Sequence, residues 1–449
     1  MKILDKMTVF LEEKFAPVAM KIGSQRHLQS IRDGLLFTMP FIILGSIFLI
    51  IGNLPVPGYN ELMNSIFGEI WKAKVNYAVR GTFDMLAIIA SVGVAYSLAS
   101  KYALDSLAVG LTSLSAFIIA TPTVINFTPN GSGVSHEVAK ALSLNYTSSR
   151  GLFVAIITAL MVTEIYNAIT KKDITIKMPD SVPPAVARSF SALIPAGASL
   201  LVVWIFRIFI EMTPFESVHN IVQVLLGKPV SMLAGSLGGI IIAIILIQLL
   251  WATGLHGSAI VIGLLRPVLL VLMDENRVAF QAGEELPNVI SLPFYELWVI
   301  VGGAGATLGL AIILLFARSK QLKELGKLSF IPGLFNINEP LIFGTPIVMN
   351  PLLLIPWIIA PIVTAVISYY TMALNIVARP IGIAVPWTTP AVISGFLATG
   401  KLSGALLQVV LIMVSAAIYY PFIKIWDTQK CIEESESVET EKKAELNTI

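Results

Sequence analysis

The sequence predicts an all-α polytopic membrane protein with about ten transmembrane helices, two re-entrant hairpins, and N- and C-termini in the cytoplasm. Three observations predict this class. Of the 449 residues, 56% are hydrophobic and only 13% are charged, whereas soluble domains carry roughly a quarter charged residues. Apolar stretches long enough to cross a hydrocarbon core of about 30 Å recur along the chain. Lysine and arginine also gather in alternate loops, as expected for a polytopic membrane protein.

The chain begins with residues 1–30, which are expected to form an amphipathic helix on the cytoplasmic surface. Acidic residues are mixed among the basic ones there, and no short apolar core precedes a small-residue cleavage site, so a signal peptide is not predicted. Nine later stretches have the length and apolar character of a spanning helix. They lie near 33–53, 82–100, 107–126, 151–169, 189–212, 232–254, 295–317, 351–375 and 403–425.

A tenth span near 257–274 is interrupted by Arg266 and Pro267, so hydropathy alone does not decide it. If this stretch spans, the cytoplasmic segments hold nineteen lysines and arginines and the outer segments hold nine. Without it, the basic cluster at 318–327 would lie outside and the asymmetry would be lost. Ten spans with both termini in the cytoplasm therefore fit best.

Two further apolar segments, 328–346 and 380–399, are too short and too rich in proline and glycine to span. Irregular backbone at membrane depth is tolerated only where protein or a water-filled cavity satisfies its polar groups. Such broken segments often mark the binding site of a transporter. The loop charges place the first as a hairpin from the cytoplasm and the second as a hairpin from outside, with their tips near one midplane site.

These features divide the chain into segments. Residues 31–213 are expected to form an N-terminal scaffold unit of five spans, and 214–231 are expected to form a linker. Residues 232–426 form a substrate-binding transport unit with five spans and both hairpins. The acidic tail 427–449 contains few aromatic residues and is expected to be a disordered cytoplasmic segment.

Polar residues at membrane depth are candidates for function, because burying them unpaired costs several kcal/mol. Glu339 stands within Asn336-Ile337-Asn338-Glu339-Pro340, in the middle of the first broken segment. A carboxylate accepts hydrogen bonds from adjacent sugar hydroxyls, and the Asn338 amide both donates and accepts them. The alternative is a Glu339 at the cytoplasmic edge that pairs with Arg318 or Lys327.

His256 lies between two glycines in Gly254-Leu255-His256-Gly257, where the backbone can turn and a ligand can approach the imidazole. The alternative is a histidine that merely satisfies a helix end. Trp387, between two prolines, and Trp251 offer indole faces on which a sugar ring can stack. The alternative for each tryptophan is anchoring at the membrane interface.

Several chemistries are not expected. The only cysteine is Cys431 in the tail, so neither an internal disulfide nor a cysteine-based metal site can form. The four histidines share no metal-ligand spacing, and no cofactor or nucleic-acid partner is expected. No Walker loop or dinucleotide fingerprint occurs, which excludes ATP-driven transport within this chain.

The sequence resembles the membrane component (enzyme IIC) of bacterial phosphotransferase systems, in the lactose/cellobiose/N,N'-diacetylchitobiose family. The likeness covers nearly the whole chain. It is most specific at Phe335–Pro340 and its continuation Leu341–Gly344, with support at Gly254–Gly257 and around Trp387.

The resemblance implies a homodimer in the bacterial cytoplasmic membrane, with the N-terminal spans at the dimer interface and the C-terminal spans carrying the sugar. The implied sugar site consists of His256, Asn338 and Glu339, with Trp387 and Trp251 as stacking platforms. The chain alone is not a catalyst. The sugar 6-hydroxyl would be phosphorylated by a phosphocysteine on a separate cytoplasmic enzyme IIB. Because the chain ends soon after its last span, a substrate of the cellobiose or diacetylchitobiose type is expected.

Either Glu339 or His256 could accept the hydroxyl proton as enzyme IIB approaches, a general-base role that requires hydrogen-bond reach. The main alternative is a proton- or sodium-coupled secondary sugar symporter in which Glu339 carries the coupling proton. A second alternative is a membrane receptor or regulatory scaffold that binds sugar without moving it, although a receptor rarely needs re-entrant hairpins.

Overall fold

The computed structural model describes residues 13–14, 16–54, 58–129, 134–179, 181–345 and 351–446. The chain forms two compact units. The N-terminal unit contains Lys21–Leu233 and Gly263–Asp274. The C-terminal unit contains Met1–Met20, Ala234–Ile262 and Glu275–Ile449.

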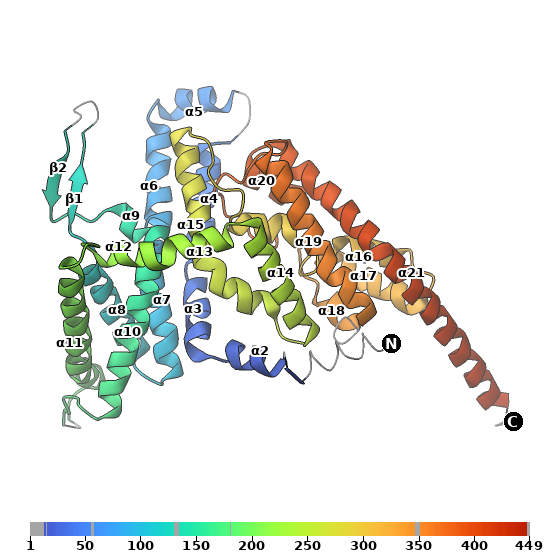
Figure 1. The fold of residues 1–449 in the computed structure, drawn as a ribbon, viewed down its shortest axis with the longest axis horizontal. Coiled ribbons are helices and arrows are strands. Elements are labelled where there is room, and N and C mark those ends of the chain that lie inside the picture. The colour runs from blue at the N-terminus through green and yellow to red at the C-terminus, as the bar shows by residue number, and fades with distance from the viewer. Residues whose placement is uncertain are drawn as a thin grey trace. The chain divides into compact units, whose positions relative to one another are not determined.

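Among the described residues, the first half of the chain is mainly helical and contains one β-hairpin (Figure 1). Two short segments, Ser149–Gly151 in 3-10 conformation and Gln223–Gly227 in π conformation, interrupt the α-helices. The helices are α2 (Ala16–Gly23), α3 (Arg26–Leu36), α4 (Met39–Gly52), α5 (Tyr59–Phe67), α6 (Trp71–Phe83), α7 (Leu86–Lys101), α8 (Ser106–Ala120), α9 (Leu144–Thr147), α10 (Leu152–Lys171), α11 (Pro184–Glu211), α12 (Val218–Val222) and α13 (Lys228–Ala234).

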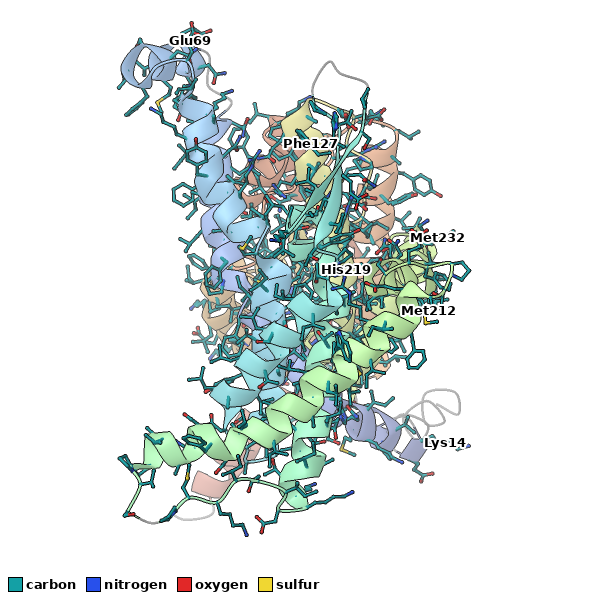
Figure 2. All side chains as sticks on the ribbon, turned by 90° about the vertical axis from the view of Figure 1, so that its left-hand side faces the viewer. Lys14, Glu69, Phe127, Met212, His219 and Met232 are labelled. Atoms are coloured by element: carbon teal, nitrogen blue, oxygen red, sulfur yellow. The ribbon has the colours of Figure 1, made fainter. Side chains whose placement is uncertain are left out.

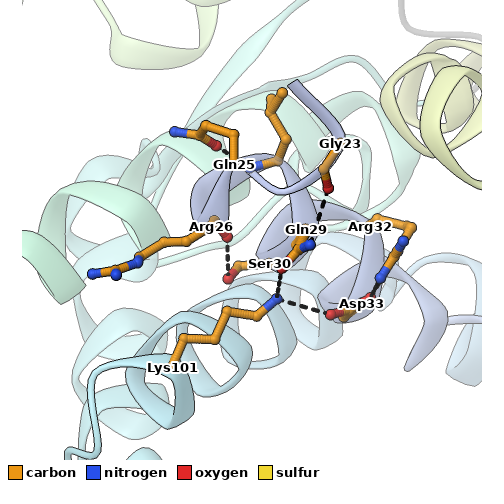
Figure 3. A network of polar contacts seen from close by, with 9 residues as sticks. Gly23, Gln25, Arg26, Gln29, Ser30, Arg32, Asp33 and Lys101 are labelled. Carbon is orange, nitrogen blue, oxygen red and sulfur yellow. Dashed lines mark hydrogen bonds and ion pairs between the residues drawn. The ribbon is translucent and has the colours of Figure 1, made fainter. Parts of the chain in front are cut away.

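In the N-terminal unit, α3 and α7 approach closely because both carry glycine where they meet. A Cβ added to Gly34 would lie 2.4 Å from the Val94 Cα atom, so only glycine permits this contact. The neighbouring ends of the two helices are joined by polar side chains (Figure 3). Lys101 Nζ lies 3.1 Å from Asp33 Oδ2 and 3.2 Å from Gln29 Oε1. Asp33 and Gln29 thus supply hydrogen-bond acceptors for the Lys101 ammonium group at the C-terminal end of the mainly apolar helix α7.

The predicted span 107–126 is shorter in the structure, where α8 ends at Ala120 and a strand follows. Strands β1 (Val124–Phe127) and β2 (His136–Ala139) pair antiparallel, with Val124 opposite Ala139. Pro122 cannot continue the helix, and the β-branched residues around it favour an extended chain. Figure 2 labels Phe127 on this hairpin.

His219, also labelled in Figure 2, lies in the segment predicted as a linker over 214–231, which is helical in the structure. Its side chain is buried, with Nε2 3.0 Å from Thr121 Oγ1 and its ring centroid 4.4 Å from that of Tyr146. The linker is therefore packed onto α8 and α9 within the N-terminal unit.

The second half of the chain contains long helices, short helices and irregular segments. The longer irregular segments include 283–291, 300–307 and 374–392, and a short one lies at 335–338. The elements are α14 (Leu237–Ala252), α15 (Gly257–Ala282), the π-helix η4 (Phe294–Val299), α16 (Leu308–Leu315), α17 (Lys320–Leu334), α18 (Glu339–Gly344), α19 (Pro351–Ala373), α20 (Ile393–Thr399) and α21 (Leu402–Leu446).

Within the described residues, seven helices are long and apolar enough to cross a membrane. An eighth is counted if the pair Val218–Ala234 and Leu237–Ala252, bent by 78°, is one span. Helix α15 is continuous across Arg266 and Pro267, as the loop charges indicated. The chain is thus an integral membrane protein of many helices.

The prediction of one spanning helix over 295–317 is wrong. The structure has η4, then irregular backbone over 300–307, and then α16. The sequence Val301-Gly302-Gly303-Ala304-Gly305 is apolar, so hydropathy counts it as a span. Glycines disfavour a helix, however, and here three of them adopt positive φ.

In the tail over 427–449, for which disorder is predicted, the structure has the end of helix α21 as far as Leu446, and residues 447–449 lie outside the described residues. Asp427 and Glu434 accept hydrogen bonds from the backbone at the start of α17. Lys430 pairs with Glu433 at 2.6 Å. Three of the acidic residues that indicated disorder, Asp427, Glu433 and Glu434, therefore have partners. Of the cytoplasmic helix predicted over 1–30, residues 1–12 and 15 lie outside the described residues, and α2 and the start of α3 account for most of the rest.

Candidate functional site

The irregular segment 300–307, here called the glycine loop, is a tight turn inside the C-terminal unit. Gly302, Gly303 and Gly305 have φ of 83°, 97° and 79°. A Cβ on Gly303 would lie 2.4 Å from Asn338 Cγ, and one on Gly305 would lie 2.3 Å from Trp357 Cε3. The glycines thus allow two side chains to pack directly on the backbone.

Within the glycine loop, the five backbone carbonyls from Gly302 to Ala306 all accept hydrogen bonds, four of them from side chains. Thr307 Oγ1 donates to the carbonyl of Gly302 at 2.7 Å, and Asn338 Nδ2 donates to that of Ala304 at 2.6 Å. The carbonyl of Gly303 accepts from the backbone N–H of Ala306 at 3.0 Å. The remaining two bonds are from Tyr419 Oη to Gly305 at 2.8 Å and from Ser415 Oγ to Ala306. These carbonyls of a buried, irregular backbone are therefore satisfied by protein, as burial requires.

Asn336 connects three irregular segments. Its side chain is buried, and its backbone φ of 60° is a conformation that asparagine tolerates better than most residues. Its Oδ1 accepts from the N–H of Gly302 at 2.6 Å, and its Nδ2 donates to the carbonyl of Trp387. One amide thus ties the turn at 335–338 to the glycine loop and to the segment around Trp387.

Asn338 is also buried, and its amide hydrogens are bonded within the protein. Its Nδ2 donates to the carbonyl of Ala304 at 2.6 Å and to Thr307 Oγ1 at 2.8 Å. The amide hydrogens expected to reach a ligand are therefore used to fix the turn. Within the described chain, Oδ1 is the Asn338 side-chain group that remains without a hydrogen-bond partner.

Glu339 begins α18 directly after this fixed turn, and its side chain is exposed. Its carboxylate makes no hydrogen bond or ion pair with the residues that the structure describes. Lys327, considered above as an alternative partner, pairs instead with Glu324 at 2.6 Å. Glu339 is thus an acceptor-only group on a rigid support, available to a ligand.

His256 precedes α15 as its N-cap residue, in a turn where Gly254 has a φ of 79°. Its Nδ1 accepts from the N–H of Ala259 at 3.2 Å. Neutral His256 therefore carries its ring hydrogen on Nε2, and this nitrogen is a donor. The exposed imidazole packs against the buried Trp251, with ring centroids 4.4 Å apart and an angle of 43° between the planes.

Trp387 is half-exposed at 39% in the second broken segment. Its neighbours form a turn in which the N–H of Thr389 donates to the carbonyl of Pro386 at 2.8 Å. Gln408 of α21 supports the following residues, because its Oε1 accepts from the N–H groups of Val392 and Gly395 at 2.7 and 2.9 Å. The indole is thus presented on fixed backbone.

The candidate residues form two groups through direct contacts. One joins Trp251 to His256, and the other joins Asn336, Asn338 and the backbone of Trp387, with Glu339 next in sequence. Asn336 and the glycine loop were not predicted from the sequence. The signals were present, since three glycines interrupt an apolar stretch and the motif contains a second asparagine.

This chain is similar to known proteins over nearly its whole length. The family model for the phosphotransferase system, EIIC, matches residues 32–361. The cellobiose-specific EIIC component of a PTS system from Geobacillus stearothermophilus is 57% identical over 435 residues, which cover 96% of each chain. The lichenan permease IIC component of Bacillus subtilis (strain 168) is 52% identical over 435 residues, again 96% of each.

A solved structure is similar in fold as well as in sequence. It is the crystal structure of the transporter ChbC, the IIC component from the N,N'-diacetylchitobiose-specific phosphotransferase system. The match has a TM-score of 0.92 and 52% identity, and it covers 95% of this chain and 99% of that one.

Proposed function

This chain belongs to the phosphotransferase system EIIC family, and on that premise we propose that it carries a β-linked disaccharide inward and presents the sugar 6-hydroxyl to phosphorylated enzyme IIB. The protein is a disaccharide permease component of a phosphotransferase system. The substrate is of the cellobiose or diacetylchitobiose type, and the phosphoryl donor is a phosphocysteine on a separate IIB chain.

One observation carries the assignment of roles: Glu339 is exposed and without a partner in the described chain, directly after a turn fixed by Asn336 and Asn338. A carboxylate that only accepts suits the hydroxyl to be phosphorylated, because it orients the O–H and takes its proton as the phosphoryl group transfers. His256 brings an exposed imidazole at the N-terminal end of α15. We therefore assign the general-base role to Glu339 and a binding role to His256.

The remaining residues shape the sugar site. Trp387 and Trp251 supply indole faces for stacking on sugar rings. Asn338 contributes Oδ1 as an acceptor, while its Nδ2 fixes the turn. Neither a cofactor nor a metal ion enters this scheme.

We further propose that the protein works as a homodimer in the bacterial cytoplasmic membrane, surrounded by lipid, with both termini on the cytoplasmic side. The N-terminal unit supplies the dimer interface. Support comes from α11, on which large apolar side chains such as Leu193, Leu201 and Phe209 are exposed. An apolar helix face needs either lipid or protein to cover it.

Transport of labelled β-disaccharides into vesicles, with and without the cytoplasmic phosphotransferase proteins, tests the proposal. We expect the 6-phosphate to accumulate only when the phosphoryl chain is complete. Glu339→Gln keeps the shape but not the charge, and it should lower vectorial phosphorylation at least about 100-fold, as loss of a general base does. Because Glu339 is exposed, the variant should fold normally.

Accumulation of free sugar driven by a proton or sodium gradient alone would instead support the symporter, with Glu339 as its coupling residue. Wild-type phosphorylation by the Glu339→Gln variant would refute the general-base role and leave the transport assignment standing.

A further inference from the structure

Helix α14 carries two buried polar groups that have no hydrogen-bond partner among the described residues. Gln248 is 1% exposed and Trp251 is 4% exposed. The two groups without a partner are Gln248 Oε1 and Trp251 Nε1. The two residues are three positions apart, so their side chains are neighbours on one helix face.

Such groups are costly, because a buried amide or indole N–H without a partner loses its hydrogen bonds to water and gains nothing in exchange. Buried polar groups are nearly always paired, and each exception requires an explanation. An apolar residue at position 248 would avoid this cost entirely. The Gln248 oxygen must therefore take its partner from a molecule other than the described chain, such as a bound water or a ligand.

Gln408 is a second buried glutamine, and its hydrogen bonds show the pattern expected of a structural role. It is also 1% exposed. Its Oε1 accepts from the N–H groups of Val392 and Gly395, and its Nε2 donates to the carbonyl of Leu297 at 2.8 Å and to Ser394 Oγ at 2.9 Å. Gln408 is satisfied by the protein alone, whereas the Oε1 of Gln248 is not.

The position of Gln248 indicates what its partner is. Trp251, its neighbour on α14, packs against the imidazole of His256 at 4.4 Å between ring centroids. Gln248 lies about one helical turn, or roughly 5 Å, further from His256 along the helix. A ligand that is bound by His256 and stacked on Trp251 therefore needs a second ring to reach Gln248. A disaccharide has one, and its hydroxyls both donate and accept.

We propose that Gln248 is a sugar-contacting residue that hydrogen-bonds the second ring of the disaccharide, together with the indole N–H of Trp251. This inference rests on the proposed function and deepens it. Gln248 selects substrates by length, because a monosaccharide bound at His256 leaves the buried amide unpaired, whereas a disaccharide satisfies it. A site built to hydrogen-bond a substrate group rejects analogues that lack that group.

The test compares Gln248→Leu with the matched control Gln408→Leu in purified protein. Binding of cellobiose, diacetylchitobiose and the corresponding monosaccharides is measured by calorimetry, and thermal unfolding is measured without sugar. Gln248→Leu should weaken disaccharide binding about 10- to 100-fold, the loss expected for buried hydrogen bonds to a ligand. Its monosaccharide affinity should stay unchanged.

The unfolding temperature separates a binding role from a structural one. Replacing an unpaired buried amide by leucine should leave the unfolding temperature of sugar-free protein unchanged or raise it. Gln408→Leu should lower it, because four satisfied groups lose their partner. If Gln248 had only a structural role, Gln248→Leu would not lower the disaccharide affinity while leaving the unfolding temperature undiminished.

Two results would overturn the inference. The first is disaccharide affinity in Gln248→Leu equal to that of the wild type, which would mean that the amide contacts no sugar. The second is a drop in unfolding temperature like that of Gln408→Leu. Failure of the proposed function is a different outcome, since the wild-type protein would then bind no β-disaccharide at all.

Discussion

Gly303 determines how closely the glycine loop can approach Asn338. Its φ is 97°, and a Cβ added there would lie 2.4 Å from Asn338 Cγ, which leaves no room for a side chain. Gly303→Ala should therefore cost about 1–2 kcal/mol in backbone strain and a further ~1–3 kcal/mol in displacement of Asn338. We expect a lower unfolding temperature and at least about tenfold weaker sugar binding.

Gly197 provides the control for this substitution. It lies within α11, and a Cβ there would meet nothing within 4 Å. Gly197→Ala should stabilise the helix by about 0.5–1 kcal/mol and leave sugar binding unchanged. Equal behaviour of the two variants would show that the glycine loop does not position Asn338.

At the residue scale, the sequence supplied the chemistry of the site but not its geometry. Glu339 and His256 stand out because acids and histidines in apolar, glycine-flanked segments are costly without a purpose. The role of Asn336 depends on contacts with Gly302 and Trp387, which are 34 and 51 positions away. Nothing local in the sequence encodes such contacts. The internal use of the Asn338 amide was unpredictable for the same reason.

At the scale of elements, the start of α17 is capped by α21. Asp427 Oδ1 accepts from the N–H of Ser319 at 2.8 Å and from that of Arg318 at 3.1 Å. Glu434 accepts from the N–H groups of Lys320 and Gln321 at 3.1 and 2.9 Å. These N–H groups have no partners within α17, and carboxylates at a helix N-terminus are stabilising.

Asp427→Ala should remove the first of these caps and destabilise α17 by about 1 kcal/mol. Amide hydrogen exchange at Arg318 and Ser319 should accelerate, and this is the measurement that checks the prediction. Glu324→Ala is the control, since Glu324 makes only an exposed pair with Lys327. Unchanged exchange in Asp427→Ala would mean that water caps α17 equally well.

Hydropathy predicted long elements well and interrupted ones poorly. Helices α10 and α11 lie close to the predicted spans, because a continuous apolar helix leaves a clear signal over about 20 residues or more. The stretch 295–317 has the same apolar content, but its glycines adopt conformations that composition does not register. The β1–β2 hairpin was missed because its strands have only four residues each.

At the scale of the whole molecule, the dimer interface remains the clearest prediction to test. The chain has one cysteine, Cys431, so a Cys431→Ser background is free of thiols. In that background, Leu201→Cys places a thiol on a residue of α11 that is 52% exposed, and Val203→Cys places one on a residue that is 0% exposed. If α11 lies at the interface, a short bismaleimide should link two copies through position 201 and not through 203.

If cysteines at several exposed positions of α11 gave only uncross-linked monomer under these conditions, the dimer interface would lie elsewhere. The experiment should use membranes rather than detergent, because detergent can replace the partner on an apolar helix face.

The length of α21 has a mechanical consequence. Its 45 residues extend about 67 Å, more than twice the hydrocarbon thickness of about 30 Å. Its polar part is a stiff rod braced against the start of α17, and not a random coil (Figure 1). A flexible tether lets an attached group search a volume, and the local concentration falls as the tether lengthens. A rod holds that group at one distance and direction. Any protein docked along the polar part of α21 would thus meet the transporter at a fixed effective concentration, set by helix geometry and not by chain entropy.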